Sequence, residues 1–231
     1  MPGSVALFLW CLGTLFELCF VVCSLVRKSF IRYFFLNLYF ILSVLASAAR
    51  FLTLHTYGSS SDQYGYAYFY TDALLTLGLF VALISLYSHV FGELGFSKQI
   101  RLGAVLLLLG TAAFSYGVVR QSEERLATSF AYELSQNLYF VGLVLTYILW
   151  GAVLKLREAR TRLVQFILAL GLYFSAYAAS YALLNLADKF GAVRYLSQLL
   201  ACLLPLSWSI TMLRHTEDSR IATAPLVAVQ R

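Results

Sequence analysis

Charged residues are scarce in this chain of 231 residues. Asp, Glu, Lys and Arg together make up 12% of it, whereas about 25% is usual in soluble globular proteins. Long polar segments are also lacking, because the longest connector between apolar stretches, residues 55–68, is too short for an independent folded unit. These two absences exclude an ordinary soluble domain and any separate catalytic or nucleic-acid-binding module.

Motifs that carry common chemistry are missing as well. The sequence has no Gly-x-Ser-x-Gly, no His-Glu-x-x-His, no paired aspartates within an apolar stretch and no Gly-rich phosphate loop. Every lysine lies at or beyond the end of an apolar stretch, so a retinal Schiff base has no nucleophile. The three histidines do not share a depth, as the axial ligands of a buried haem would. We therefore expect a protein that is not an enzyme and holds no cofactor.

Cysteine is rare, and its spacing favours packing over chemistry. Cys11, Cys19, Cys23 and Cys202 all lie inside apolar stretches, without the spacing of a zinc site or an exposed partner for a disulfide. Such thiols usually act as small core residues, so no metal site is predicted. Asn-x-Ser/Thr sequons are absent too, which fits a bacterial membrane.

Apolar stretches fill most of the chain, and each is close to the roughly 20 residues that a membrane-spanning helix needs. They cover residues 5–26, 33–54, 69–91, 102–119, 130–154, 163–186 and 195–213. A helix satisfies its own backbone N–H and C=O groups, as hydrocarbon requires. The sequence predicts an all-α, polytopic bundle of seven transmembrane helices over residues 1–213. Residues 214–231 are expected to form a disordered cytoplasmic tail.

The basic residues are distributed unevenly, and this distribution predicts an orientation. Of the 17 Lys and Arg residues, five follow the even-numbered stretches or end them. The other twelve follow the odd-numbered stretches: Arg27, Lys28, Arg32, Lys98, Arg101, Lys155, Arg157, Arg160, Arg162, Arg214, Arg220 and Arg231. Excess basic charge marks the cytoplasmic side. We expect a multi-pass protein of the bacterial cytoplasmic membrane, with its N-terminus outside, that contacts the lipid bilayer and not nucleic acid.

Small residues at helical spacing predict close helix contacts. Gly103, Gly110 and Gly117 repeat at a strict interval of seven. Gly171, Ser175 and Ala179 form a second stripe. Tyr173, Tyr177 and Tyr181 lie on nearly the opposite face from this second stripe. The tyrosine row is typical of interhelical packing, and the alternative is that it lines a cavity.

One tetrapeptide occurs twice. Asn37-Leu38-Tyr39-Phe40 in the second stretch recurs as Asn137-Leu138-Tyr139-Phe140 in the fifth. These stretches cross the membrane in opposite directions, the arrangement found in the inverted repeats of many transporters. Leu, Tyr and Phe are abundant here, so chance recurrence is the competing interpretation.

Glu17 is the carboxylate nearest the middle of any predicted span. Ionisable groups at this depth are costly and are usually functional. Trp10, Gly13 and Thr14 share its helical face, which indicates that this face points into the bundle. Glu17 is a candidate proton or cation site if it borders water, and a structural hydrogen-bonding group if it does not.

A second set of polar residues gathers near the predicted outer surface. Together they could form an extracytoplasmic pocket, within which Arg50 and Asp72 could pair, or each could reach the interface independently. The members of this candidate outer pocket are Arg50, Asp72, Glu133, Gln136, Asn137, Asn185 and Gln198.

Four aromatic-rich runs carry a family resemblance. Residues 33–40 (YFFLNLYF), 68–72 (YFYTD), 85–91 (SLYSHVF) and 133–142 (ELSQNLYFVG) resemble a group of bacterial seven-helix integral membrane proteins whose function is not established. The resemblance implies seven helices and no particular activity.

Three functions follow from these observations. The leading hypothesis is a non-enzymatic membrane protein that senses or binds a small molecule from the outer side. It could also be a subunit that assembles with other membrane proteins in a larger complex. The alternative is a small proton-linked transporter that uses Glu17.

Overall fold

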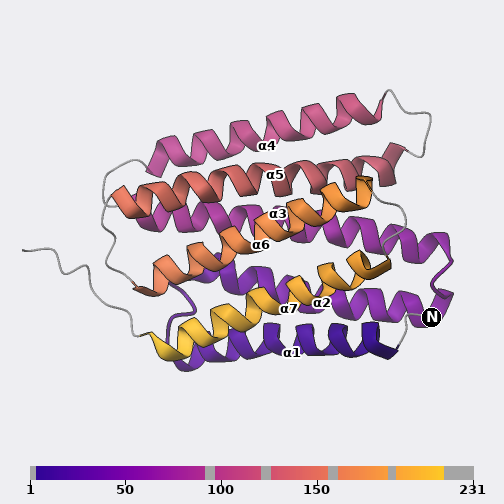
Figure 1. Cartoon of the computed structure of the whole chain (residues 1–231), viewed down its shortest axis with the longest axis horizontal. Helices are drawn as coiled ribbons and strands as arrows, with labels where there is room; N and C mark the ends of the chain where they lie inside the picture. Colours follow the sequence, from indigo (N-terminus) through magenta and orange to yellow (C-terminus); the bar gives the residue numbers. More distant parts are fainter. Residues whose placement is uncertain (1–3, 92–96, 121–125, 156–160, 187–190, 216–231) are drawn as a thin grey trace, which may run out of the picture.

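A computed structural model describes residues 4–91, 97–120, 126–155, 161–186 and 191–215, and it is all-helical over these residues (Figure 1). No β-strand occurs in this part of the chain. The helices are α1 (Ser4–Val26), α2 (Phe34–Tyr57), α3 (Asp62–Phe91), α4 (Ser97–Val119), α5 (Leu126–Lys155), α6 (Thr161–Leu186) and α7 (Gly191–Arg214). The predicted all-α class is confirmed, and each apolar stretch falls on one helix.

Six helical segments, one in each of α1 to α6, are long and apolar enough to cross a membrane. In α7 the described apolar segment, Leu199–Arg214, is shorter. The surface of the bundle is apolar as well: Leu102, Leu106 and Leu109 of α4 are each more than 60% exposed. Side chains of this kind are stable on the outside of a bundle when lipid surrounds them. These are the properties of a multi-pass membrane protein.

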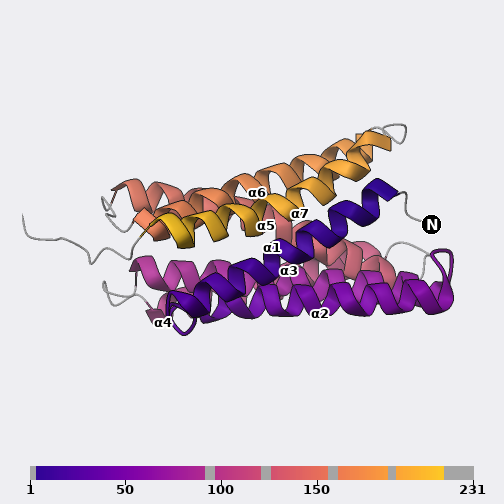
Figure 2. The same ribbon diagram turned by 90° about the horizontal axis from the view of Figure 1, so that it is seen from below.

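Successive helices run in opposite directions, so that the N-terminus of α1, the α2–α3 turn and the start of α7 lie at one end of the bundle (Figure 1). We call this the N-terminal end. Helix α1 packs on α2 and α7, α3 packs on α2 and α5, and α6 packs on α5 and α7. Helix α4 is peripheral, in contact with α5 and α3. Seen from below, α1 runs obliquely, and it diverges from α2 toward the N-terminal end (Figure 2).

Four large rings close the bundle on the other side of its midpoint. Phe20, Phe40, Phe166 and Trp208, from α1, α2, α6 and α7, are each less than 2% exposed. In five ring pairs among them the centroids lie 4.8 to 6.2 Å apart, within the range of favourable aromatic contact. Trp208 Nε1 also donates a hydrogen bond to the carbonyl oxygen of Phe166 at 3.2 Å. This aromatic cluster joins four helices and lies beyond Glu17 as seen from the N-terminal end.

The predicted connector at residues 55–68 is wrong, because most of it is helical. Helix α2 continues to Tyr57 and α3 begins at Asp62, which leaves only a turn of residues 58–61. Gly58 takes a positive φ of 82°, which suits a glycine at a helix end. Ser61 Oγ accepts a hydrogen bond from the N–H of Tyr64 at 3.1 Å, as a helix N-cap does. Helix ends depend on caps and turns as well as on apolar content. Residues 58–62 contain a turn glycine and a capping serine.

The predicted close contact along Gly103, Gly110 and Gly117 is also wrong among the helices that the structure describes. A Cβ atom added at any of the three would meet no neighbouring atom within 4 Å. The seam therefore faces away from the other described helices. Gly171 of the second stripe behaves as expected, since a Cβ there would lie 3.1 Å from the Thr146 side chain of α5.

Candidate functional site

A cavity of about 390 Å³ lies between α1, α2, α3, α5, α6 and α7, and none of its described lining residues comes from α4. At the N-terminal end its wall includes Trp10 of α1, and Tyr64 and Tyr68 from the first turns of α3. Its innermost residues include Phe40 and Leu204. A cavity of this size is typical of a small-molecule site.

Glu17 lies deep in this cavity. It is seven residues from Trp10 along α1, which corresponds to about 10 Å at 1.5 Å per residue. Trp10, Gly13 and Thr14 line the same wall, so the helical face predicted to point into the bundle does so. The cavity ends at the level of Phe40, one of the four rings of the aromatic cluster. The described lining thus extends from the N-terminal end of the bundle to its middle.

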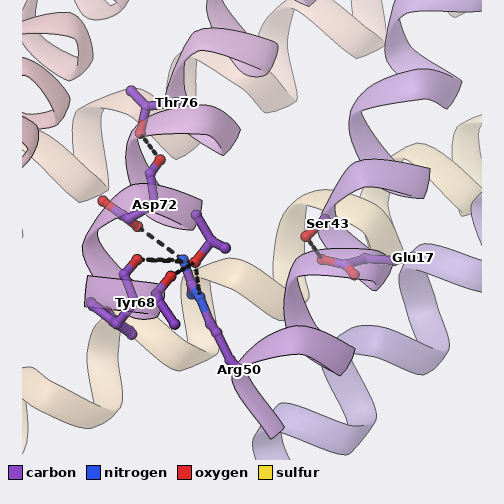
Figure 3. A network of polar contacts seen from close by, with 8 residues as sticks. Glu17, Ser43, Arg50, Tyr68, Asp72 and Thr76 are labelled. Carbon is purple, nitrogen blue, oxygen red and sulfur yellow. Dashed lines mark hydrogen bonds and ion pairs between the residues drawn. The ribbon is translucent and has the colours of Figure 1, made fainter. Parts of the chain in front are cut away.

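The two carboxylate oxygens of Glu17 differ in their partners. Ser43 Oγ of α2 donates a hydrogen bond to Oε1 at 2.6 Å (Figure 3). Oε2 is buried and has no hydrogen-bond partner among the residues that the structure describes. The Glu17 residue as a whole is only 9% exposed. A buried acceptor without a partner is costly, and it belongs to a residue that lines the cavity.

Arg50 of α2 is held by several groups on α3 (Figure 3). Its Nε donates to Thr71 Oγ1 at 2.6 Å, and its Nη2 donates to the carbonyl oxygen of Tyr68 at 3.3 Å. Its Nη2 also lies 3.8 Å from Oδ1 of Asp72, and its guanidinium carbon lies 4.4 Å from the centre of the Tyr68 ring. The expected ion pair between Arg50 and Asp72 is therefore present. Both residues line the cavity, nearer its mouth than Glu17.

Tyrosines from three helices form another part of the wall. Tyr139 of α5 stacks on Tyr177 of α6 with ring centroids 4.9 Å apart and planes 13° apart. Tyr173 of α6 lies 4.6 Å from Tyr177. Tyr39 of α2 lines the cavity with them, and we call these four residues the tyrosine wall. Tyr173 and Tyr177 therefore both pack between helices and line the cavity, so the two alternatives predicted for them do not exclude each other. The side chain of Tyr181 lies outside the described residues.

Three further members of the predicted outer pocket, all on α5, do not line this cavity. Glu133 and Gln136 are half-buried on α5 and do not line it, and Asn137 Nδ2 donates to Ser115 Oγ of α4 at 3.0 Å. Spacing explains the separation. Tyr132 and Tyr139 line the cavity from one face of α5, whereas residues 133 and 137, four apart, share another face, and Gln136 lies between the two faces. The side chains of Asn185 and Gln198 lie outside the described residues.

Sequence reasoning named Arg50 of α2 but missed the other polar residues that α2 contributes, although a signal was present. Tyr39, Ser43, Ser47 and Arg50 all line the cavity. They occur at intervals of four, four and three, which places them on one helical face. A stripe of polar groups within an apolar helix indicates a buried polar surface, and here that surface faces Glu17.

The described residues include no group of three or more His, Cys, Asp or Glu side chains that could hold a metal ion. The four cysteines are free, and Cys202 lines the cavity, where its Sγ donates to the carbonyl oxygen of Leu9 at 3.3 Å. Comparisons with models of protein families, with curated protein sequences and with solved structures gave no match for this chain.

Proposed function

We propose that this protein is a non-enzymatic membrane receptor that binds a small molecule entering from the outer face of a bacterial cytoplasmic membrane. In this proposal all seven helices span the bilayer, with the N-terminus outside and the C-terminus in the cytoplasm. The observation that carries the proposal is the cavity, whose lining runs from the N-terminal end to Glu17, a buried carboxylate with one oxygen that lacks a partner among the described residues. The basic residues after α1, α3, α5 and α7 support the orientation.

The aromatic cluster favours a receptor over a transporter. A transporter must open its site to each side in turn, whereas Phe20, Phe40, Phe166 and Trp208 pack tightly beyond the cavity. The alternative, a proton-linked transporter, rests on Glu17, because an intramembrane carboxylate in a cavity is typical of proton pathways. For that function, four buried rings would have to separate during each cycle.

Helix α7 offers a route from the cavity to the cytoplasmic end. Its residues Ala201, Cys202, Leu204 and Pro205 line the cavity. At its far end, Arg27 Nη2 donates to the carbonyl oxygen of Leu213 at 2.6 Å, and Arg162 Nε donates to that of His215 at 3.0 Å. Cationic groups stabilise the carboxyl end of a helix. A ligand that shifts α7 would therefore alter contacts at the end that precedes the tail, as a sensor requires.

A subunit of a larger membrane complex is the second candidate. It is favoured by the open glycine seam and the exposed leucines of α4, which no other described helix covers. Small residues of this kind let a neighbouring helix approach closely in membranes. The two candidates are compatible, since receptors can pass a signal to a partner protein through such a face.

Cavity filling tests the receptor proposal. Purified protein would be incubated with a mixture of small metabolites, washed, and analysed for retained molecules by mass spectrometry. We expect wild type to retain molecules that Ser47→Phe loses, because the added ring occupies the cavity. Ala48→Phe is the matched control, since Ala48 is exposed on the outside of the same helix. An identical set of retained molecules in all three proteins would contradict the proposal.

A further inference from the structure

We infer that the cavity selects an organic monocation, a protonated amine with an apolar body, and that the amine binds at Glu17. This inference rests on the proposed binding function and specifies the class of ligand. Its starting point is the unpartnered, buried Oε2 of Glu17. An ammonium group carries three N–H donors and a full positive charge, so it satisfies this oxygen and balances the carboxylate.

The charges of the cavity point to the same class. Among the described residues that line it, the carboxylic acids and bases are Glu17, Arg50 and Asp72. Arg50 already pairs with Asp72 and also contacts Thr71 and Tyr68. The negative charge of Glu17 therefore remains unbalanced when it is ionised. A buried charge is stable when it is paired, and a single ligand cation provides the pair.

The tyrosine wall adds affinity for a cation. The faces of aromatic rings are electron-rich and attract ammonium groups, most strongly where water is excluded. Tyr39, Tyr139, Tyr173 and Tyr177 line the cavity that contains Glu17. A further acceptor comes from α7: Pro205 has no N–H to donate to the carbonyl oxygen of Ala201, and both residues line the cavity.

The rest of the lining suits the body of such a ligand. Trp10, Phe40, Leu75 and Leu204 provide apolar surface around the polar groups. A small cavity with apolar walls and a few convergent polar groups binds a ligand by burying its body and orienting its head group. The amine is thus expected at the depth of Glu17, with the apolar body extending toward the mouth.

Paired thiol reagents test the charge preference without a known ligand. Ser47→Cys would be made in a background that lacks the native cysteines, with serine at position 202 to retain a donor to Leu9. The purified protein in neutral detergent would be treated with a trimethylammonium-bearing or a sulfonate-bearing methanethiosulfonate. At Ser47→Cys, the rate with the cationic reagent would be divided by the rate with the anionic reagent. Dividing this ratio by the same ratio at Ser59→Cys, in the exposed α2–α3 turn, gives the normalised ratio.

We expect the normalised ratio to favour the cation by at least about tenfold, since one unbalanced charge acts strongly in a medium of low dielectric constant. Arg50 lies three residues from Ser47 and would favour the anion, so a preference for the cation cannot come from it. Glu17→Gln should bring the normalised ratio close to unity. Glu133→Gln, which removes a carboxylate outside the cavity, should leave it unchanged.

The outcomes separate the two proposals. A normalised ratio within about twofold of unity, or one that favours the anion, would overturn the inference about amines and leave the binding cavity intact. A cation preference that persists in a folded Glu17→Gln variant would also overturn it. If neither reagent reacts at Ser47→Cys, the cavity is closed to solutes and the receptor proposal fails as well. Tyr177→Leu gives a second check, because loss of one ring should slow the cationic reagent alone.

Discussion

At the scale of single residues, Glu17 dominates the chemistry of this chain. It is 9% exposed and hydrogen-bonded through one oxygen only. It lies near the middle of α1, at a depth where carboxylates are usually functional, and it lines the cavity while Ser43 holds one of its oxygens. The second polar group of the cavity, Arg50, is tied to α3 by hydrogen bonds and an ion pair, so the two groups have different roles.

Glu17→Gln separates the receptor from the transporter. An amide keeps the shape of the side chain and its bond to Ser43, and an interhelical hydrogen bond in membranes contributes only about 0.6 kcal/mol on average. We therefore expect nearly unchanged thermal stability of the purified protein. In reconstituted vesicles, a receptor shows no pH-dependent solute flux before or after the change. Flux in wild type that Glu17→Gln abolishes would instead establish the transporter.

At the scale of helices, close contacts between specific faces hold the cavity open. Phe174 of α6, which is 1% exposed, packs directly over Gly142 of α5. Both residues belong to the helices that carry Tyr139, Tyr173 and Tyr177. The tight α5–α6 contact thus fixes the tyrosine wall, in the same way that Gly13 allows α7 to approach α1 at Cys202.

Gly142→Ala tests this contact. A Cβ at Gly142 would lie 2.5 Å from the Phe174 ring, which is too close for any real contact. We expect a loss of about 1–3 kcal/mol in stability, as for other overpacked cores, measured as a lower midpoint of thermal unfolding. Gly151→Ala on the same helix is the control, because a Cβ there meets nothing within 4 Å and alanine favours the helix. Phe174→Leu combined with Gly142→Ala should recover part of the loss. Equal midpoints for the two alanine variants would contradict the packing argument.

The sequence was sufficient to predict the helices but not the helix faces that pair. Apolar length locates each helix, because the membrane imposes it on any chain. Which faces meet depends on packing that no single stretch contains. The seam of Gly103, Gly110 and Gly117 therefore looks like a contact but is open, and Asn137 turns toward α4 while Tyr139, two residues on, faces the cavity. Glu17 could be predicted as a candidate from the sequence, because a carboxylate in the middle of an apolar stretch costs free energy in hydrocarbon whatever the packing around it.

At the scale of the whole molecule, the bundle is asymmetric along its axis. The N-terminal end holds the cavity, whereas the aromatic cluster and the arginine contacts of α7 lie toward the other end. An open end and a closed end suit a protein that receives a ligand on one side of a membrane and responds on the other. The six long apolar helices establish the membrane setting in which this asymmetry acts.

Cysteine labelling in intact cells tests the orientation. We expect single cysteines at positions 58–63 to react with an impermeant thiol reagent from outside, and cysteines at positions 158–161 to react only after the membrane is permeabilised. The reverse pattern would contradict the proposed orientation. Labelling of both segments from one side would contradict the number of spans.

Access to the cavity from each side of the membrane tests the central claim of a blind, outward-facing pocket. The measurement is the rate at which Ser47→Cys, in the background without native cysteines, reacts with an impermeant methanethiosulfonate in right-side-out and in inside-out vesicles. We predict rapid reaction in right-side-out vesicles and at least about a hundredfold slower reaction in inside-out vesicles, because the aromatic cluster closes the path. Comparable rates from both sides would show a path through the bundle and contradict the account.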